Sequence, residues 1–546
     1  MEIINIYAIV FGSILLSLAF IKALYYVSPW KNVLAIFISK HLTYPYIIHR
    51  HHFCGPWTRA SVFLHLCYYA SNLTCLLFAV SSVSDIARRA GVLSLINMVF
   101  LFVAPSLSFL ADILGISLQM CRRIHRSTAW ISIFLLAIHI FGILIAEKNT
   151  LSFQDAPNLH ALIAGSAAAT IVLLCFPIFR RLAYECFLKF HEALAALYLY
   201  AVWRHLPPNQ LLALYCVYAC VGAFTSTLCL QIATFVYRNG LFMSKGYPRA
   251  YIRCGIIPAN ADKTKDVENA VIVRVALPRP MKLDAGQYIN LWMPTVGIFS
   301  WAQTHPFMVI SWSTETQSSL DLFIKPRKGL SAALYERALK APEGSVSFAT
   351  FITGLHGISQ PIDQYQTVLL LVNGPGIAAA LSYVRKLIRG YNTSFSRTRR
   401  IHLVWELKTL GLAAAAEEFL DSLLEEDTFA DGYIFTTSIY VESGKVFEVG
   451  NHNRGSVYQG HPDYDEIIRA EVLGDFPNSK TNSKAEHERM TVADGFIDSE
   501  KNGKGQGWKM LVMVSLPGKQ RDRVQSIVRE YLQDGVAMTE LEFQPD

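Results

Sequence analysis

Four histidines in the apolar N-terminal half of the chain share one spacing. His125 and His139 lie in one hydrophobic stretch and His191 and His205 in another, so each pair is separated by fourteen residues. Fourteen residues of α-helix return to nearly the same face, with a rise of about 21 Å. Imidazole is a standard axial ligand of haem iron, and ionisable side chains inside membrane helices usually serve a function. The spacing therefore predicts two bis-histidine haem sites stacked across a bilayer.

The segments that would position these histidines are strongly hydrophobic. A hydrophobic stretch of about 20 residues can cross a bilayer as a helix. Residues 1–235 contain seven such stretches, at 4–26, 60–80, 92–112, 126–146, 159–178, 185–204 and 210–235. One stretch separates the two that carry the histidines, so these two should run parallel. We therefore expect His125 to face His191 and His139 to face His205, although any single histidine could instead bond to a neighbouring helix.

Lysine and arginine are concentrated in the loops on one side of the predicted spans. The positive-inside rule then places the N-terminus outside and the large C-terminal half in the cytosol. All ten cysteines lie at or before Cys254 without a CxxC pair, so we expect no disulfide framework and no zinc or iron–sulfur site. The net charge of +7 is modest and scattered, and gives no argument for nucleic-acid binding.

The C-terminal half has the pattern of a soluble protein with two kinds of sheet. Short β-runs from about 250 to 355 alternate around turn residues, as in a small antiparallel β-barrel. From 366 onward, apolar strands are followed by helical stretches, which predicts a parallel sheet with crossover helices. We thus expect a multi-domain membrane protein: an all-α bundle of about seven helices, an antiparallel barrel and an α/β domain. Polar residues 473–508 are predicted to be a flexible insertion.

Two motifs in this half are suited to binding nucleotides. The sequence HPFMVISW, from His305 to Trp312, follows Gly286-Gln287-Tyr288. Asn373-Gly374-Pro375-Gly376 stands where a predicted strand ends and a helix begins. Glycines at such a point let the backbone approach a phosphate, and the helix N-terminus favours its charge.

Together, the histidine pairs, HPFMVIS and the NGPGIA turn resemble the ferric reductase family, the fungal-type ferric-chelate reductases related to NADPH oxidases. The resemblance implies a transmembrane domain at 1–240 with two b-type haems, an FAD-binding barrel at 250–360 and an NADP-binding domain at 361–546. It implies FAD contacts at His305, Pro306, Phe307, Met308, Val309, Ile310, Ser311, Lys328, Gly329, Leu330, Ser331 and Phe543. It implies nicotinamide nucleotide contacts at Gly374, Pro375, Gly376, Ile377, His461 and Ser515.

The chain departs from the family pattern in three places. Ser515-Leu516-Pro517-Gly518 stands where relatives carry Cys-Gly-Pro, and Gly460-His461-Pro462 stands where many carry Gly-Arg-Pro. The Gly-Pro-Tyr-Gly type loop is replaced by residues 354–357. The first change should slow hydride transfer. The second weakens the case for NADPH over NADH, because a neutral histidine pairs poorly with a 2′-phosphate, and NADPH remains the expected donor because of the family.

The expected function is a transmembrane oxidoreductase that passes electrons from cytosolic NADPH through FAD and two haems to an extracytoplasmic acceptor. Ferric chelates or siderophores are the expected acceptors, with cupric ion as a second one, in support of iron uptake. We expect a multi-pass protein of the plasma membrane, or else of the vacuolar membrane, with a functional link to an iron permease or oxidase. The alternatives are an NADPH oxidase that produces superoxide and a non-enzymatic membrane protein with a degenerate reductase tail.

Overall fold

The chain divides into two compact units. One comprises residues 1–22 and 63–235, and the other comprises residues 23–62 and 236–546. The computed structural model describes residues 31–51, 55–146, 154–182, 184–242, 246–255, 269–297, 300–327, 329–341, 344–427, 433–442, 454–474 and 509–545. The predicted span 4–26 and nearly all of the predicted insertion 473–508 lie outside the described residues.

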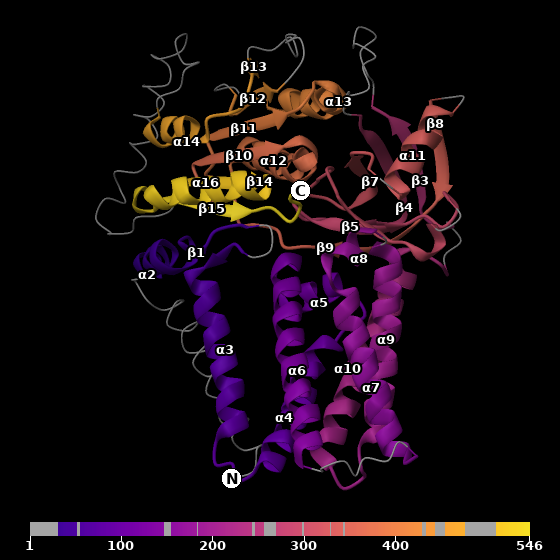
Figure 1. Ribbon diagram of the computed structural model, residues 1–546. Coiled ribbons are helices and arrows are strands. Elements are labelled where there is room, and N and C mark those ends of the chain that lie inside the picture. Colours follow the sequence, from indigo (N-terminus) through magenta and orange to yellow (C-terminus); the bar gives the residue numbers. More distant parts are fainter. Residues whose placement is uncertain are drawn as a thin grey trace. The chain divides into compact units, whose positions relative to one another are not determined.

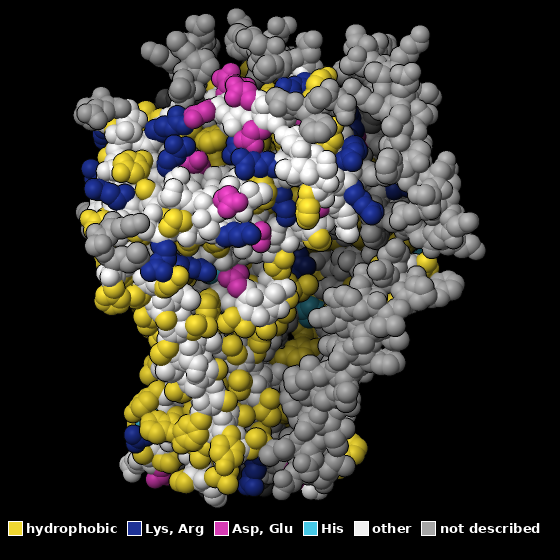
Figure 2. Space-filling view, turned by 180° about the vertical axis from the view of Figure 1, so that it is seen from behind, with side chains coloured by type: hydrophobic (Ala, Val, Ile, Leu, Met, Phe, Trp, Pro, Cys, Tyr) yellow, Lys and Arg dark blue, Asp and Glu magenta, His cyan; other side chains and the backbone are white. Residues whose placement is uncertain are grey.

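The first unit is helical. Helix α4 packs against α6, and α7 packs against α9 (Figure 1). Many large apolar side chains on these helices are exposed, including Trp130 and Phe141. On the face seen in Figure 2, hydrophobic side chains cover most of the helical unit, as a surface in contact with lipid requires. The helices are α3 (Arg59–Leu77), α4 (Val83–Leu101), α5 (Leu107–Leu114), α6 (Leu118–Ala146), α7 (Ala156–Leu174), α8 (Pro177–Leu182), α9 (Tyr184–His205) and α10 (Leu211–Arg238).

The predicted span at 92–112 is wrong. Helix α4 begins earlier, where the Ser82 hydroxyl accepts a hydrogen bond from the Asp85 N–H at 3.1 Å, and it ends at Leu101. A separate short helix, α5, begins at Leu107. Pro105 lies between them, and proline lacks a backbone N–H and disfavours helix at the residue before it. Four of the described helices, α3, α6, α7 and α10, are long and apolar enough to cross a membrane.

The second unit contains the predicted antiparallel β domain. Its four-stranded sheet has the order β7-β4-β3-β8 and its three-stranded sheet the order β6-β5-β9. A bridge between Val309 and Leu322 joins the two sheets. Apolar side chains from both sheets form one core, and α11 (Leu330–Leu339) packs against it. The strands are β3 (Arg249–Cys254), β4 (Val271–Met281), β5 (Tyr288–Trp292), β6 (His305–Met308), β7 (Gln317–Ile324), β8 (Ser345–Ala349) and β9 (Phe351–His356).

The same unit contains the predicted parallel sheet, with strand order β13-β12-β11-β10-β14-β15. All of its neighbouring strands pair in parallel. The chain starts at β10, moves outward through β11 to β13, and then returns to the other side of β10 with β14. The order therefore reverses between β10 and β14, where open α/β sheets bind ligands beyond the carboxyl ends of the strands. The strands are β10 (Thr367–Asn373), β11 (Arg400–Leu407), β12 (Phe435–Val441), β13 (Gly455–Gln459), β14 (Met510–Ser515) and β15 (Val536–Glu540).

Helices connect the parallel strands. A segment near the N-terminus belongs to the same unit. The helices are α12 (Ile377–Asn392), α13 (Gly411–Glu426), α14 (Tyr464–Leu473) and α16 (Gly518–Glu530). The segment contains α2 (Lys31–Ile38), the π-helical turn η1 (Ser39–Thr43) and the strand pair β1 (Tyr46–Ile48) and β2 (Trp57–Thr58). It lies beside α16 and β15 (Figure 1), and Tyr44 packs against their core.

Candidate functional site

His139 and His205, which the predicted topology places toward the outer side of the membrane and which we call the outer pair, have a fixed orientation. On α6, the Nδ1–H of His139 donates to the carbonyl oxygen of Ala87 at 2.9 Å. On α9, the Nδ1–H of His205 donates to the carbonyl oxygen of Pro157 at 3.0 Å. A histidine that binds a metal usually donates its second ring N–H in this way, which fixes the tautomer. Each ring therefore retains the Nε2 lone pair for an iron atom.

The inner pair is arranged differently. His125 on α6 and His191 on α9 lie close enough for their charges to interact. The Nδ1 atoms of both rings are buried and have no hydrogen-bond partner within the described residues. His139 and His205 are likewise within electrostatic reach of one another. The structure thus brings together the two pairs that the fourteen-residue spacing predicts.

The helices that carry these pairs pack on different neighbours. Helix α6 packs on α4, and α9 packs on α7, but α6 and α9 are not among the helix pairs in close backbone contact in the described part of the chain. The donor set and the orientation of the His139 and His205 rings fit haem.

Small residues on α4 that the motifs do not reveal support His139. A Cβ atom added to Gly91 would lie 2.9 Å from His139 Nδ1, so only glycine leaves room for the ring. One turn further along α6, a Cβ on Gly142 would lie 2.6 Å from the Cβ of Ala87. Close approach of α4 and α6 therefore places the Ala87 carbonyl within reach of the imidazole. A search for small residues one helical turn apart could have found these positions.

Polar residues also occupy the level between the two histidine pairs. Ser132 on α6 and Tyr198 on α9 each lie seven residues from both histidines of their helix. Ser132 donates to the carbonyl oxygen of Ser94 at 3.0 Å, and Ser94 donates to that of Ser132 at 2.9 Å. Tyr198 is also hydrogen-bonded to Ser94. These buried bonds hold α6 and α9 to α4 at the middle of the helical unit.

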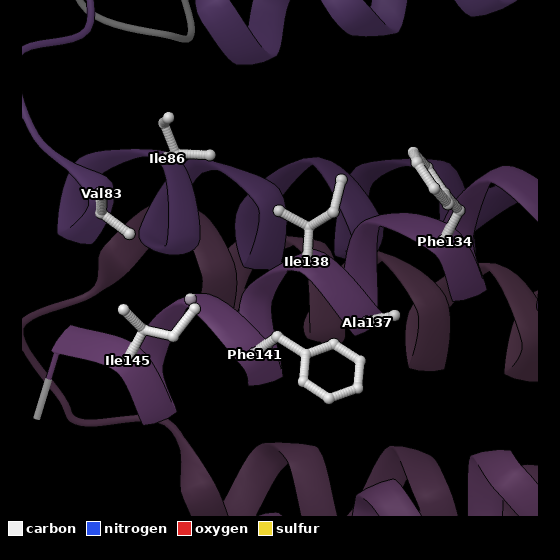
Figure 3. A pocket seen from close by; sticks show the side chains of 8 residues that line it. Val83, Ile86, Phe134, Ala137, Ile138, Phe141 and Ile145 are labelled. Carbon is white, nitrogen blue, oxygen red and sulfur yellow. The ribbon is translucent and has the colours of Figure 1, made fainter. Parts of the chain in front are cut away.

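An apolar hollow of about 410 Å³ lies between α4 and α6. The labelled side chains in Figure 3 are aliphatic or aromatic, among them Ile86, Ile138 and Phe141. None of the residues that line the hollow carries a charge or a metal-binding group. The lining of this hollow therefore offers no group for acid–base chemistry or metal binding.

The predicted FAD residues lie on β6 and the start of α11. His305, Pro306, Phe307 and Met308 form β6, which pairs with β5. Val309, Ile310 and Ser311 follow it, and Ser311 Oγ accepts from the Asp321 N–H at 3.1 Å. Lys328 lies outside the described residues.

Gly329 begins the second part of the predicted FAD site. It has a φ of +77°, and no atom of the described residues lies within 4 Å of the place where a Cβ would be. It precedes the first residue of α11, Leu330, and Ser331 Oγ accepts from the Arg327 N–H at 2.9 Å. An open backbone at a helix N-terminus fits a diphosphate group.

Ser382 and Tyr383, which no sequence motif indicated, contact the Gly-Gln-Tyr motif of the β domain. Gly286, in the Gly-Gln-Tyr motif, has a φ of +84°, and its N–H donates to Ser382 Oγ at 3.0 Å. A Cβ on Gly286 would collide with the hydroxyl group of Tyr383. The Tyr383 hydroxyl in turn accepts from the Gln360 N–H at 3.0 Å. This glycine therefore permits close packing of the β domain on α12.

The predicted nucleotide residues gather at the reversal point of the parallel sheet. Gly374, Pro375 and Gly376 form a 3-10 turn after β10, and Ile377 begins α12. Ser515 ends the neighbouring strand β14, and a Cβ on Gly376 would lie 2.6 Å from its Oγ. Ser515 Oγ also donates to the carbonyl oxygen of Phe543 at 2.7 Å. The turn at 374–376, Ser515 and the backbone of Phe543 thus lie in one cluster.

His461 has a partner that its motif does not show. Its Nδ1–H donates to Glu406 Oε1 at 2.7 Å, and this bond raises the pKa of His461 above its ordinary value. Burial would raise the pKa of Glu406, but hydrogen bonds from His461, Asn373, Gln520 and Tyr464 outweigh burial and lower it. The protonated fraction of His461 at neutral pH is therefore larger than a free histidine would have. This weakens the argument from the sequence that a neutral His461 would pair poorly with the 2′-phosphate of NADPH.

Family models match the chain in the order of these sites. The ferric reductase like transmembrane component matches residues 90–202, which include all four histidines. An FAD-binding domain matches residues 260–379, and the ferric reductase NAD binding domain matches residues 365–491. The chain belongs to the ferric reductase family. Its predicted fold class is confirmed, with a helical membrane region followed by FAD-binding and NAD-binding domains.

The curated proteins to which the chain is similar come from fungi. It is 26% identical over 270 residues to ferric reductase transmembrane component 3 of Saccharomyces cerevisiae, covering 49% of the chain and 34% of that protein. It is 27% identical to ferric/cupric reductase transmembrane component 2 of the same yeast, covering 44% and 30%. It is 23% identical to the probable cell surface ferric reductase kap2 of Aspergillus oryzae, covering 59% and 44%. The matched regions span less than half the length of each of these relatives.

Proposed function

We propose that this chain is a ferric-chelate reductase that carries electrons from cytosolic NADPH, by way of FAD and two b-type haems, to ferric chelates outside the membrane. The observation that carries the proposal is the meeting of two histidine pairs at two levels of one helical unit. The names of the relatives, which include ferric and ferric/cupric reductases, support iron chelates or siderophores as acceptors and cupric ion as a second one.

The histidines would hold the haems. His139 and His205 would offer Nε2 at the outer level, each held by its bond to a backbone carbonyl. His125 and His191 would do so at the inner level. A haem held by two imidazole ligands would supply one-electron transfer. The chain itself orients the rings of the outer pair and keeps the two levels about 21 Å apart along the helices.

The second unit would hold FAD and NADPH. Bound flavin accepts a two-electron hydride and releases single electrons. β6 with residues 309–311, and the Gly329 turn with α11, would bind FAD. The 374–376 turn and Ile377 would bind the nucleotide diphosphate at the N-terminus of α12. Ser515 holds the backbone of Phe543, whose ring would cover the flavin.

We place the protein in the plasma membrane, with the vacuolar membrane as the alternative. The cell surface relative from Aspergillus supports this placement. Reduced iron released on the outer face would then serve a neighbouring iron permease or oxidase, which is the functional link we propose.

Cells that make the chain test this function. Surface reduction of Fe(III)-citrate, measured as the Fe(II) complex of a membrane-impermeant dye, should rise well above that of control cells. It should return to background with His139→Ala, while the variant reaches the membrane in equal amount. Superoxide release without Fe(III) reduction would instead identify an oxidase. Absence of both, with no bound haem or flavin, would identify a non-enzymatic protein.

A further inference from the structure

A buried carboxylate at the carboxyl edge of the parallel sheet gathers four hydrogen-bond donors. Glu406, near the end of β11, is only 4% exposed. Oε1 accepts from His461 Nδ1 at 2.7 Å, and Oε2 accepts from Asn373 Nδ2 at 2.9 Å. Oε2 also accepts from the Tyr464 hydroxyl at 3.0 Å and from Gln520 Nε2 at 2.7 Å. A buried carboxylate is stable only when it is bonded in this way.

Three of the four donors adjoin segments of the proposed nucleotide site. Asn373 immediately precedes the turn at 374–376, and the two strands place it directly beside Glu406. Gln520 lies in the first turn of α16, five residues after Ser515. His461 follows β13, and its side chain is 64% exposed. Glu406 therefore links the loops of four parallel strands at the edge where the nucleotide would bind.

Gln520 has an unused acceptor. Its Nε2 must face the carboxylate, because only the amide nitrogen can donate to Glu406. Its Oε1 is consequently turned away, and it is buried without a hydrogen-bond partner among the residues that the structure describes. Buried amide oxygens are normally satisfied. A hydroxyl or amide group of a bound nucleotide would supply the missing donor.

We infer that Glu406 is a positioning residue for the nicotinamide nucleotide. It holds the imidazolium of His461 at the open edge of the sheet for the 2′-phosphate, and it turns Gln520 Oε1 toward a hydroxyl or amide donor that NADPH and NADH share. This inference rests on the proposed function, and it names the groups that bind each part of the donor.

The charges around His461 set the direction of its pH dependence. Glu406 on β11 and Glu442 at the end of β12 both act on its imidazole. Asp463 and Asp465 at the start of α14 lie within 3.9 Å of Arg523 on α16, which balances their charge. The Glu406 bond raises the pKa of His461. The imidazolium is therefore present at low pH and is lost as pH rises through that elevated value, so preference for a 2′-phosphate should fall with rising pH.

Binding of NADP⁺ and NAD⁺ to the oxidised holoprotein, measured by calorimetry across the neutral range, tests the inference. The preference for NADP⁺, expressed as the dissociation constant of NAD⁺ divided by that of NADP⁺, should fall about two- to fivefold as pH rises, as expected for one exposed charged contact. Glu406→Gln should move the midpoint of this change to lower pH. In His461→Ala, the remaining pH dependence of this preference should come only from titration of the 2′-phosphate of NADP⁺. Glu466→Gln, an exposed charge change on α14, should behave like the parent.

Gln520→Met provides a second arm, because it removes an acceptor that both nucleotides would use. It should weaken NADP⁺ and NAD⁺ binding by similar factors, while FAD content stays at the parent level. An unchanged midpoint in Glu406→Gln, together with unchanged affinities in Gln520→Met, would overturn the inference while the proposed function stands. A parent protein that binds neither nucleotide would overturn the proposed function and the inference with it.

Discussion

At the scale of single residues, Gly91 leaves the space in which the imidazole ring of His139 lies. The imidazole fills the space that a Cβ would need, at 2.9 Å from Nδ1. Gly91→Ala should therefore displace the ring and break its bond to Ala87. We expect the purified variant to hold about one haem per chain instead of two, by pyridine haemochrome assay. Gly165→Ala is the control, since among the described residues its new Cβ would meet only Ile140, at 3.8 Å. Two haems in Gly91→Ala would show that His139 is not a ligand.

Ser515 gives a second prediction for one residue. Its hydroxyl donates to the carbonyl oxygen of Phe543, and a buried bond of this kind contributes about 1 kcal/mol. Ser515→Ala should release the C-terminal segment and raise the FAD dissociation rate about fivefold. Flavin fluorescence after dilution measures this rate. Ser526→Ala, which removes a hydroxyl from the exposed surface of α16, is the control. Equal rates in all three proteins would remove Phe543 from the flavin site.

The single residues also show how far sequence alone can reach. The histidine pairs could be predicted because helical periodicity links residues of one helix. His461 could be found by its motif, but its charge could not, because Glu406 lies 55 residues away in the chain. Gly91, Ser382 and Tyr383 could not be found, since their roles depend on which helix or strand packs against them.

At the scale of elements, the segment at 39–50 is bonded to α16 and β15. The carbonyl oxygen of Tyr44 accepts from Gln525 Nε2 at 2.9 Å, and its hydroxyl accepts from the Met538 N–H at 3.1 Å. Burial raises the pKa of Tyr44 to about 12, so the hydroxyl stays protonated. Arg50 forms two bonds to Asp522, at 2.9 and 3.1 Å. The segment is thus part of the nucleotide-binding unit.

Tyr44→Phe tests this attachment. The change removes the acceptor of the Met538 N–H, and an unsatisfied buried donor costs about 1–3 kcal/mol. We expect the midpoint of thermal unfolding of the second unit, followed by FAD release, to fall by several degrees. Tyr247→Phe, at an exposed tyrosine of the same unit, should leave the midpoint unchanged. A parent-like midpoint in Tyr44→Phe would mean that the segment adds nothing to the stability of this unit.

Elements were predictable where one pattern ran over many residues. The parallel strands are buried on both faces and read as apolar runs, so the α/β domain was expected correctly. The span at 92–112 failed because a hydropathy average passes over Pro105, whereas the backbone turns there. The N-terminal segment could not be placed, since its bonds reach residues almost 500 positions away.

At the scale of the whole molecule, the proposed haem ligands and the proposed flavin and nucleotide residues belong to different compact units. Loss of an outer ligand should therefore leave the second unit intact. We expect His205→Ala to keep the parent rate of anaerobic flavin reduction by NADPH, while Fe(III) reduction falls to background. Stopped-flow absorbance at the flavin band measures the first step. A variant that loses flavin reduction together with Fe(III) reduction would contradict this separation.

The most direct test of the electron path is the anaerobic spectrum of the purified holoprotein. NADPH should first bleach the flavin and then reduce both b-type haems, and a later addition of Fe(III)-citrate should reoxidise the haems completely. The two histidine pairs and the nucleotide cluster predict this order of reduction and reoxidation. Haems that stay oxidised while the flavin is reduced, or reduced haems that do not react with Fe(III)-citrate, would contradict the account.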